Sequence, residues 1–305
     1  MTDFARARID EKHAGLMTVF DRLWRTRNTA LGDDTGSCLT KTPKLLLKPP
    51  EIIRMRFTLT LIAAPQKIMY LAADHFRRKR ILQDVNIIYG SALPSIYGAQ
   101  EYAAVLNRVL LRYGINPRFN HELIEIHPEN KEAIFQLRNG PANKRVAIPY
   151  DILHLVPPQR APDFIRESPL ADTQKPGEGW VRADKYTLQH VAYPNVFALG
   201  DIAGTPNAKT GAAAARQAPV VAANLLALLN GTEPMSQYNG YIACPIVTGY
   251  GRMLLCELDY TGRPAPAIPI IDTFRERYDM WLLKKYGLRC SIGMSYFADG
   301  IYPLG

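Results

Sequence analysis

The stretch Tyr193–Asn230, YPNVFALGDIAGTPNAKTGAAAARQAPVVAANLLALLN, decides the fold class of this sequence. Residues 196–199 are apolar and predict a short buried strand that ends at a Gly-Asp pair, residues 200–201. A polar loop follows, and an alanine-rich helix is predicted to begin near Lys209. A strand, a glycine-containing turn and a helix in this order are typical of an α/β domain.

The end of the predicted strand suits a flavin adenine dinucleotide (FAD) cofactor. A carboxylate there can accept hydrogen bonds from ribityl hydroxyls, and a helix N-terminus favours an electron-rich group. Small residues at the start of the helix leave room for a planar ring to approach the backbone. We therefore predict that FAD is bound by Gly200, Asp201, Lys209, Thr210 and Gly211. The alternative is an ordinary strand–loop–helix unit without a cofactor.

Two further stretches narrow this interpretation. They are Ala63–Lys79, AAPQKIMYLAADHFRRK, and Tyr238–Tyr260, YNGYIACPIVTGYGRMLLCELDY. With the first stretch, they resemble the sulfide:quinone oxidoreductases, which are FAD-dependent disulfide oxidoreductases. The resemblance runs from about Ala63 to Leu288 and implies an α/β, FAD/NAD(P)-binding Rossmann-like fold of three layers. Sulfide as the substrate is implied by the resemblance alone.

The resemblance also implies a chemistry for the cysteines. In this family two cysteines flank the flavin, sulfide attacks their disulfide, and a persulfide forms before the electrons pass to a quinone. Cys244 matches the flavin-side cysteine and is the predicted catalytic thiol; the alternative is a buried core cysteine. The second cysteine should stand at Leu61, which cannot form a disulfide. Cys256 lies in an apolar strand pattern, so we expect it to be structural.

One expected feature is missing from the sequence. A dinucleotide-binding flavoprotein of this type should begin with a strand, a GxGxxG turn and a helix, and no such fingerprint is present. We therefore expect the N-terminal FAD half-domain to be missing, and the chain by itself to bind FAD weakly or not at all. The residues after Leu288 also differ from the aromatic tail of the family, which a frameshift there would explain.

The pattern divides the chain into four regions. We expect an unmatched, poorly ordered segment at 1–60, a middle dinucleotide-fold domain at 61–150, the C-terminal part of the FAD domain at 151–235, and a redox-cysteine and membrane-facing region at 236–305. Predicted helices cover 66–78, 99–113 and 273–286, and predicted strands cover 85–89, 118–126, 132–137, 146–149 and 151–156. Thr273 and Glu276 are spaced as a capping box for the last helix, and a hairpin-like region begins at Tyr238.

Composition limits the other function classes. The 305 residues carry a formal charge of +9 and are 47% hydrophobic, which is typical of a soluble globular protein. Four widely spaced cysteines indicate neither a disulfide framework nor a metal site, and no nucleic-acid motif accompanies the basic charge. No uninterrupted apolar run approaches the length of a bilayer.

The resemblance finally implies partners and a location. The partners are sulfide, a ubiquinone-type quinone, a small sulfur acceptor and a peripheral membrane surface, with no nucleic acid. The location is the mitochondrial inner membrane or a bacterial plasma membrane. Two alternatives stay open: a non-catalytic remnant of such a flavoprotein, and a quinone-linked NADH dehydrogenase, which needs a glycine-rich nicotinamide turn in the middle domain.

Overall fold

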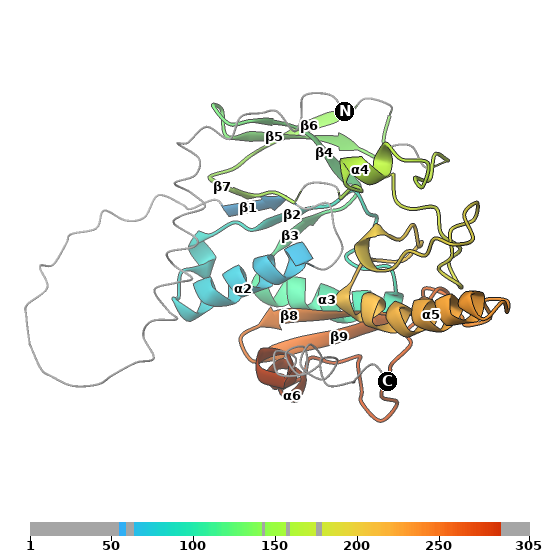
Figure 1. Ribbon diagram of the computed structural model, residues 1–305. Helices are drawn as coiled ribbons and strands as arrows, with labels where there is room; N and C mark the ends of the chain where they lie inside the picture. The colour runs from blue at the N-terminus through green and yellow to red at the C-terminus, as the bar shows by residue number, and fades with distance from the viewer. Residues whose placement is uncertain (1–54, 59–63, 142–143, 157–158, 175–178, 288–305) are drawn as a thin grey trace, which may run out of the picture. The chain divides into compact units, whose positions relative to one another are not determined.

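The computed structural model describes residues 55–58, 64–141, 144–156, 159–174 and 179–287 (Figure 1). The chain divides into two units, residues 1–49 and 50–305, and all described residues lie in the second. Predictions about Leu61, about the segment before residue 55 and about the tail after residue 287 lie outside the described residues. The division into four regions remains a prediction.

A parallel sheet with two crossover helices forms the centre of the second unit. The strand order is β3-β2-β1-β7, and all neighbouring pairs are parallel. The strands are β1 (Met55–Thr58), β2 (Ile88–Gly90), β3 (Asn116–Arg118) and β7 (Ile152–His154). Helix α2 (Ala64–Arg78) connects β1 to β2, and α3 (Gln100–Tyr113) connects β2 to β3. This βαβ arrangement is an α/β fold, as predicted.

Helix α3 shows why these residues become helical. Its apolar residues recur at three- and four-residue spacing, and the resulting stripe is buried: Tyr102, Ala103, Val105, Leu106, Val109, Leu110 and Tyr113. The helix ends at Gly114, whose φ of 62° is the left-handed conformation that glycine adopts without a steric cost. The predicted bounds of both helices are confirmed to within two residues.

A three-stranded antiparallel sheet follows β3. Its strands are β4 (His121–His127), β5 (Glu132–Leu137) and β6 (Arg145–Pro149), in the order β4-β5-β6. Ala133 and Phe135 are buried in β5 while their neighbours are less so, which is the alternation of a half-buried strand. The Phe135 ring lies so close to Gly90 that a Cβ there would be 2.9 Å from it. This contact joins the two sheets.

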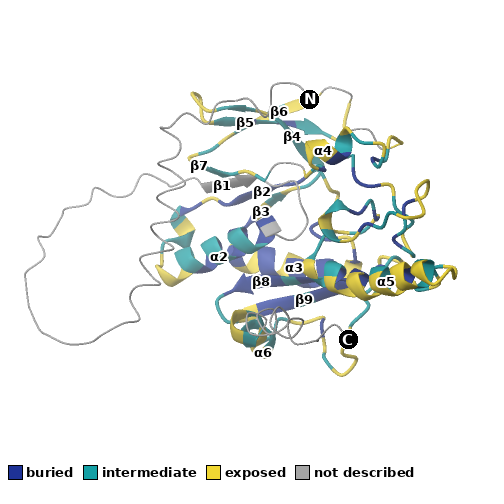
Figure 2. Ribbon diagram, in the orientation of Figure 1, coloured by how far each residue is buried: buried dark blue, intermediate teal, exposed yellow. Residues whose placement is uncertain are grey.

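A hairpin of β8 (Ile242–Gly249) and β9 (Arg252–Leu258) covers the other side of α2 and α3. Figure 1 shows these helices between the parallel sheet and the hairpin, and Figure 2 shows that the hairpin is largely buried. The buried Asp74 of α2 accepts a 2.9 Å hydrogen bond from the amide of Tyr250 in the hairpin turn and pairs with Arg77 and Arg78. The hairpin turn is therefore held to α2 by an ionised side chain.

The segment between β7 and the hairpin contains little regular structure before residue 211. It includes the single-turn helix α4 (Asp163–Arg166) and several isolated bridges. The strand predicted at 196–199 is wrong: Phe197 makes one antiparallel bridge, to Gln189, and no ladder forms. Residues 196–198 form backbone hydrogen bonds with residues 188–190. This pairing is too short to make a strand.

Helix α5 (Gly211–Leu229) has an unusual distribution of polarity. Its buried positions include the polar Gln217 and Asn224, whereas Leu226 and Leu229 are 60% and 73% exposed. Figure 2 shows exposed residues along most of this helix. By length and composition it is also apolar enough to cross a membrane, and 17% of its most apolar window is buried. A single helix of this kind is weak evidence for a membrane span.

The last helix begins later than predicted. Helix α6 (Tyr278–Leu282) continues into a π-helical turn, Leu283–Gly287, and its N-cap residue is Arg277. The capping box of Thr273 and Glu276 is therefore wrong. The Thr273 hydroxyl is hydrogen-bonded to Tyr102, and the Glu276 carboxylate accepts hydrogen bonds from Arg112 and Thr248.

Candidate functional site

The Gly-Asp pair forms a tight turn that is fixed to α5. Residues Gly200–Ile202 make one 3-10 turn, and Gly200 has a φ of 70°, which favours glycine. The Gly200 amide donates a 2.7 Å hydrogen bond to Oε1 of Gln217, whose side chain is buried. Asp201 itself is exposed. The turn thus presents a carboxylate to the outside from a backbone held by the helix.

The N-terminus of α5 is capped by Thr210. Its side-chain oxygen accepts a 3.1 Å hydrogen bond from the Ala213 amide, the arrangement that satisfies one of the free amides of a first turn. A Cβ added at Gly211 would meet no atom within 4 Å. The helix start predicted near Lys209 and Thr210 is confirmed, and the space beside Gly211 is open.

Lys209 is directed to a different group of residues. Its ammonium donates a 2.5 Å hydrogen bond to the Ala203 carbonyl and lies 4.1 Å from the ring centroid of Trp180. Trp180 and Ala203 belong to a small hydrophobic cluster with Ala161, Ile165, Val181 and Ala198. The charge of Lys209 is therefore held over an indole ring beside the Asp201 turn.

Cys244 lies in the main hydrophobic core, between the hairpin and α2. It is 8% exposed and belongs to the cluster that α2, α3 and the hairpin build together. Cys256 of β9 is directly opposite it in the strand register and is fully buried. Both thiols are free.

Two polar side chains lie close to Cys244. Burial raises the pKa of the Cys244 thiol, while the nearby Lys67 ammonium and a hydrogen bond with the Tyr97 hydroxyl act in the opposite direction. Lys67 comes from α2, and its own pKa is lowered by burial and by Lys284. A thiolate formed at Cys244 would thus be stabilised by a cation and a hydroxyl.

Sequence reasoning missed both of these residues. Lys67 stands inside the APQK sequence that carried the resemblance, and that position is the signal that could have indicated it. Tyr97 lies in the segment before α3, and no sequence pattern marks it.

The helix start and Cys244 are connected through β8. Ile242 packs with Ala213 of α5 in one hydrophobic cluster. Cys244 is two residues further along β8, about 7 Å at the rise of an extended strand, and points to the same face. Ala213 of α5 and Ile242 of β8 thus share one cluster, Cys244 belongs to the main core, and Lys209 contacts Trp180.

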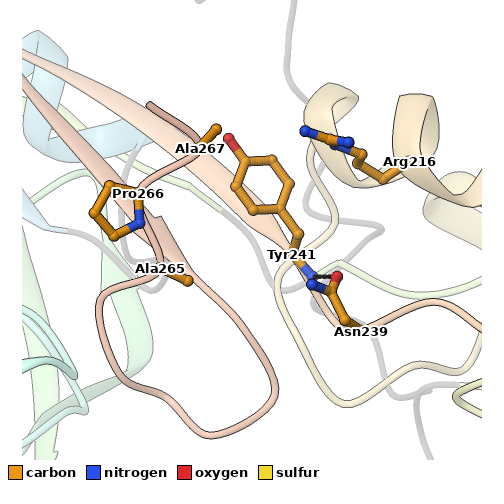
Figure 3. Close-up of a pocket in the computed structure, with 6 residues that line it drawn as sticks. All are labelled: Arg216, Asn239, Tyr241, Ala265, Pro266 and Ala267. Carbon is orange, nitrogen blue, oxygen red and sulfur yellow. Dashed lines mark hydrogen bonds between the residues drawn. The ribbon is translucent and has the colours of Figure 1, made fainter. Parts of the chain in front are cut away.

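A pocket is lined by residues of α5, of the segment before β8 and of the segment after β9 (Figure 3). It is lined by Arg216, Asn239, Tyr241, Ala265, Pro266 and Ala267, and none of these is a predicted site residue. The Arg216 guanidinium is 5.2 Å from the Tyr241 ring centroid, and the Tyr241 hydroxyl donates a hydrogen bond to Glu257. Its lining thus includes Arg216 of α5, the helix whose first residue is the predicted flavin residue Gly211.

No family model matches the chain. Among curated proteins, it is 41% identical over 221 residues to the mitochondrial sulfide:quinone oxidoreductase of Mus musculus, a match that covers 72% of this chain and 48% of that protein. It is 40% identical over 223 residues to the protein of the same name from Dictyostelium discoideum, covering 73% of this chain and 48% of that protein. The chain thus spans about half the length of the curated relatives it matches.

A solved structure shows the same fold at lower identity. The sulfide:quinone oxidoreductase of the bacterium Aquifex aeolicus matches with a TM-score of 0.57 and 16% identity, over 73% of this chain and 52% of that chain. At this identity the match establishes the fold alone. The two curated relatives, however, are 41% and 40% identical to this chain, far above that level. Over the residues that align, this chain therefore belongs to the sulfide:quinone oxidoreductase family.

Proposed function

We propose that this chain is the part of a sulfide:quinone oxidoreductase that carries the flavin-side cysteine and contacts the flavin ring. The enzyme would oxidise sulfide through a cysteine persulfide and FAD and pass two electrons to a quinone. The observation that carries the proposal is the 41% identity over 221 residues with a protein of that name. Cys244 as the reactive thiol and Asp201 as the flavin-contacting carboxylate are the residues we assign.

The residues present fit one end of FAD. An exposed carboxylate at Asp201, open space at Gly211 and the amides of a capped helix start suit the ribityl chain and the ring. The sequence contains no GxGxxG turn for the pyrophosphate. The chain would therefore hold the ring and ribityl chain through Gly200, Asp201, Thr210 and Gly211. Lys209, held over Trp180, would add positive charge next to this turn.

Bound FAD would supply the acceptor for two electrons. The chain's own residues perform the sulfur chemistry. Cys244 binds the sulfur atom at a buried position, and the charge of Lys67 favours the thiolate there against the effect of burial. A partly buried nucleophile of this kind protects a reactive persulfide from solvent.

The partners and the location follow from the relatives. Two relatives are named as mitochondrial, which supports a mitochondrial location for this chain, and within it we propose the inner membrane. The C-terminal region exposes large apolar side chains beside Lys284 and Lys285, a composition that suits a peripheral membrane surface. These exposed residues are Ile268, Ile270, Phe274, Tyr278, Leu283 and Tyr286. A ubiquinone-type quinone and a small sulfur acceptor would be the other partners.

The second candidate is a non-catalytic remnant. It is favoured by one observation: Leu61 stands where the family resemblance expects the second cysteine, and leucine cannot form a disulfide. A quinone-linked NADH dehydrogenase is the less supported alternative, because the middle region offers no glycine-rich nicotinamide turn.

The test is sulfide-dependent quinone reduction, followed by the quinone absorbance, with excess FAD. The part of the mouse relative that lies outside the alignment is added as a second polypeptide, and Leu61→Cys supplies the second cysteine that the family expects. We expect no turnover from this chain alone and turnover from the mixture, abolished by Cys244→Ser. Turnover that is unchanged by Cys244→Ser contradicts the proposal. A mixture that binds flavin and never reduces quinone favours the remnant.

A further inference from the structure

Cys244 and Cys256 face each other across the hairpin. In the antiparallel register of β8 and β9, Cys244 is paired with Cys256, as Ile242 is with Leu258 and Ile246 with Leu254. Directly opposite residues have Cα atoms about 4.5 or 5.5 Å apart, depending on the type of pair. Both spacings lie inside the range of about 4.4–6.8 Å that a disulfide spans. The backbone therefore places the two thiols where a bond can form.

The two thiols also share their polar neighbours. Burial raises the pKa of both thiols, and the Tyr97 hydroxyl and the Lys67 ammonium act in the opposite direction on both. The remaining surroundings are apolar residues of α2, α3 and the hairpin. Two thiols paired across a hairpin, with a hydroxyl and an ammonium that both favour the thiolate, make a site suited to thiol–disulfide chemistry.

We propose that Cys256 is the second redox thiol of this chain and forms a cross-strand disulfide with Cys244 that sulfide opens. The sulfide step rests on the proposed function; the disulfide itself does not. Cys256 would take the part of the second cysteine for which this sequence has Leu61.

The proposed steps are balanced as follows. A peroxide oxidises the Cys244 thiol to a sulfenic acid and leaves as water. The Cys256 thiol then attacks that sulfur, the S–S bond forms, and a second water is released. Hydrosulfide next attacks the Cys244 sulfur, the S–S bond breaks, and Cys256 departs as a thiolate. Cys244 then carries the persulfide, and Cys256 takes up a proton.

Exposure fixes the order of attack. Cys244 is 8% exposed and Cys256 is fully buried, so reagents from solvent reach Cys244 first. Burial raises the pKa of the Cys256 thiol well above its usual value, while Tyr97 and Lys67 act in the opposite direction on the thiolate that leaves. Cys244 would therefore be the residue that binds the sulfur atom, and Cys256 the residue that resolves it.

The test uses the full chain with Cys38→Ser and Cys290→Ser, so that two thiols remain. The chain is treated with hydrogen peroxide while folded, its thiols are counted after denaturation, and it is digested with trypsin, which cuts after Arg252 between the two cysteines. We expect both thiols to be lost, a mass lower by two hydrogen atoms, and a disulfide-linked pair of peptides. Sulfide added to the oxidised chain should then yield one persulfide, on the peptide that contains Cys244.

Cys256→Ser and Cys256→Ala are the matched variants, and far-UV circular dichroism reports whether they fold. In either variant, Cys244 should oxidise without forming a linked peptide. Two intact thiols or overoxidised, unlinked cysteines in the parent chain overturn the inference even if neither variant folds. A disulfide that sulfide does not open overturns the sulfide step. Failure of the proposed function is a separate result. It is the absence of quinone reduction when the Leu61→Cys variant is mixed with the unaligned part of the mouse relative, because that variant has its own second cysteine.

Discussion

The Gly200 amide donates a 2.7 Å hydrogen bond to the buried side chain of Gln217, seventeen residues along the chain. This one contact fixes the Asp201 turn to the second turn of α5. It also gives a buried polar side chain a partner that it needs, since an unpaired buried group is costly. The orientation of the Asp201 carboxylate therefore depends on a residue that no flavin would touch.

Gln217→Leu should loosen the turn and lower stability. The Gly200 amide would lose its acceptor, which costs about 1–3 kcal/mol for a buried donor. Urea unfolding measures the loss. Gln189→Leu is the control, because the Gln189 amide bonds to Pro194 at an exposed position, and we expect a cost below about 1 kcal/mol. Equal costs for the two variants would contradict this account of the turn.

Because α5 buries polar residues and exposes apolar ones, we expect substitution of its polar Asn224 to cost more stability than substitution of its apolar Leu226. Asn224 makes hydrogen bonds to Thr187 and Ser236 from a buried position, whereas Leu226 is 60% exposed. Asn224→Leu should therefore destabilise the fold by at least about 2 kcal/mol, because Ser236 and Thr187 lose partners. Leu226→Asn should change stability by less than about 0.5 kcal/mol. A larger cost for the Leu226 variant in urea unfolding would show that this face of α5 is covered.

Asp74 should make stability depend on acidity. Burial alone raises the pKa of this carboxyl, but hydrogen bonds from Tyr250 and Arg77 and the charge of Arg78 outweigh it and hold the pKa below its usual value. Because the folded pKa is depressed, the stabilisation is present above the unfolded pKa of about 3.9 and is lost as pH falls through the folded value.

Asp74→Asn should thus lower the free energy of unfolding by about 1–3 kcal/mol at pH 7 and reduce its loss between pH 5 and pH 3. Asp163→Asn is the control, since Asp163 makes ion pairs at the surface with Arg160 and Arg166. Surface pairs of this kind contribute about 0–1 kcal/mol. An Asp74 variant whose stability falls with acid as steeply as the parent's would count against this assignment.

Several elements could be predicted from sequence because their signals are local. Helices α2 and α3 follow from apolar spacing, and the strands predicted at 132–137 and 146–149 agree with β5 and β6, whereas the one predicted at 118–126 is divided between β3 and β4. The failures depend on distant partners. Glu276 fits a capping box by spacing, yet Arg112, 164 residues away, takes its carboxylate.

The pairing of Cys244 with Cys256 could be predicted from the sequence in part. Cys244 and Cys256 are each six residues from Tyr250, so a hairpin centred on that residue places them opposite each other. The turn could have been located from the Gly-Tyr-Gly sequence at 249–251. The shared contacts with Lys67 and Tyr97 could not, because they come from α2 and from the segment before α3.

Lys67 should control the reactivity of Cys244. Burial raises the thiol pKa, so alkylation by iodoacetamide should continue to accelerate above pH 9, and removal of the Lys67 charge should raise the pKa further. Lys67→Met should slow alkylation of Cys244 several-fold at pH 8, as measured by peptide mass. Lys79→Met is the control, because Lys79 is exposed and follows directly after the end of α2. Equal rates for the two variants would exclude Lys67 as the neighbouring charge.

The most direct test of the flavin assignment is a fluorescence titration with riboflavin, which carries the ring and ribityl chain and lacks the adenosine. We predict weak, saturable quenching by the folded chain. Asp201→Ala should weaken it at least about tenfold, because hydrogen bonds to a charged group contribute about 1.5–3 kcal/mol. Gln217→Leu should weaken it less. Affinity that is unchanged in Asp201→Ala would contradict the account.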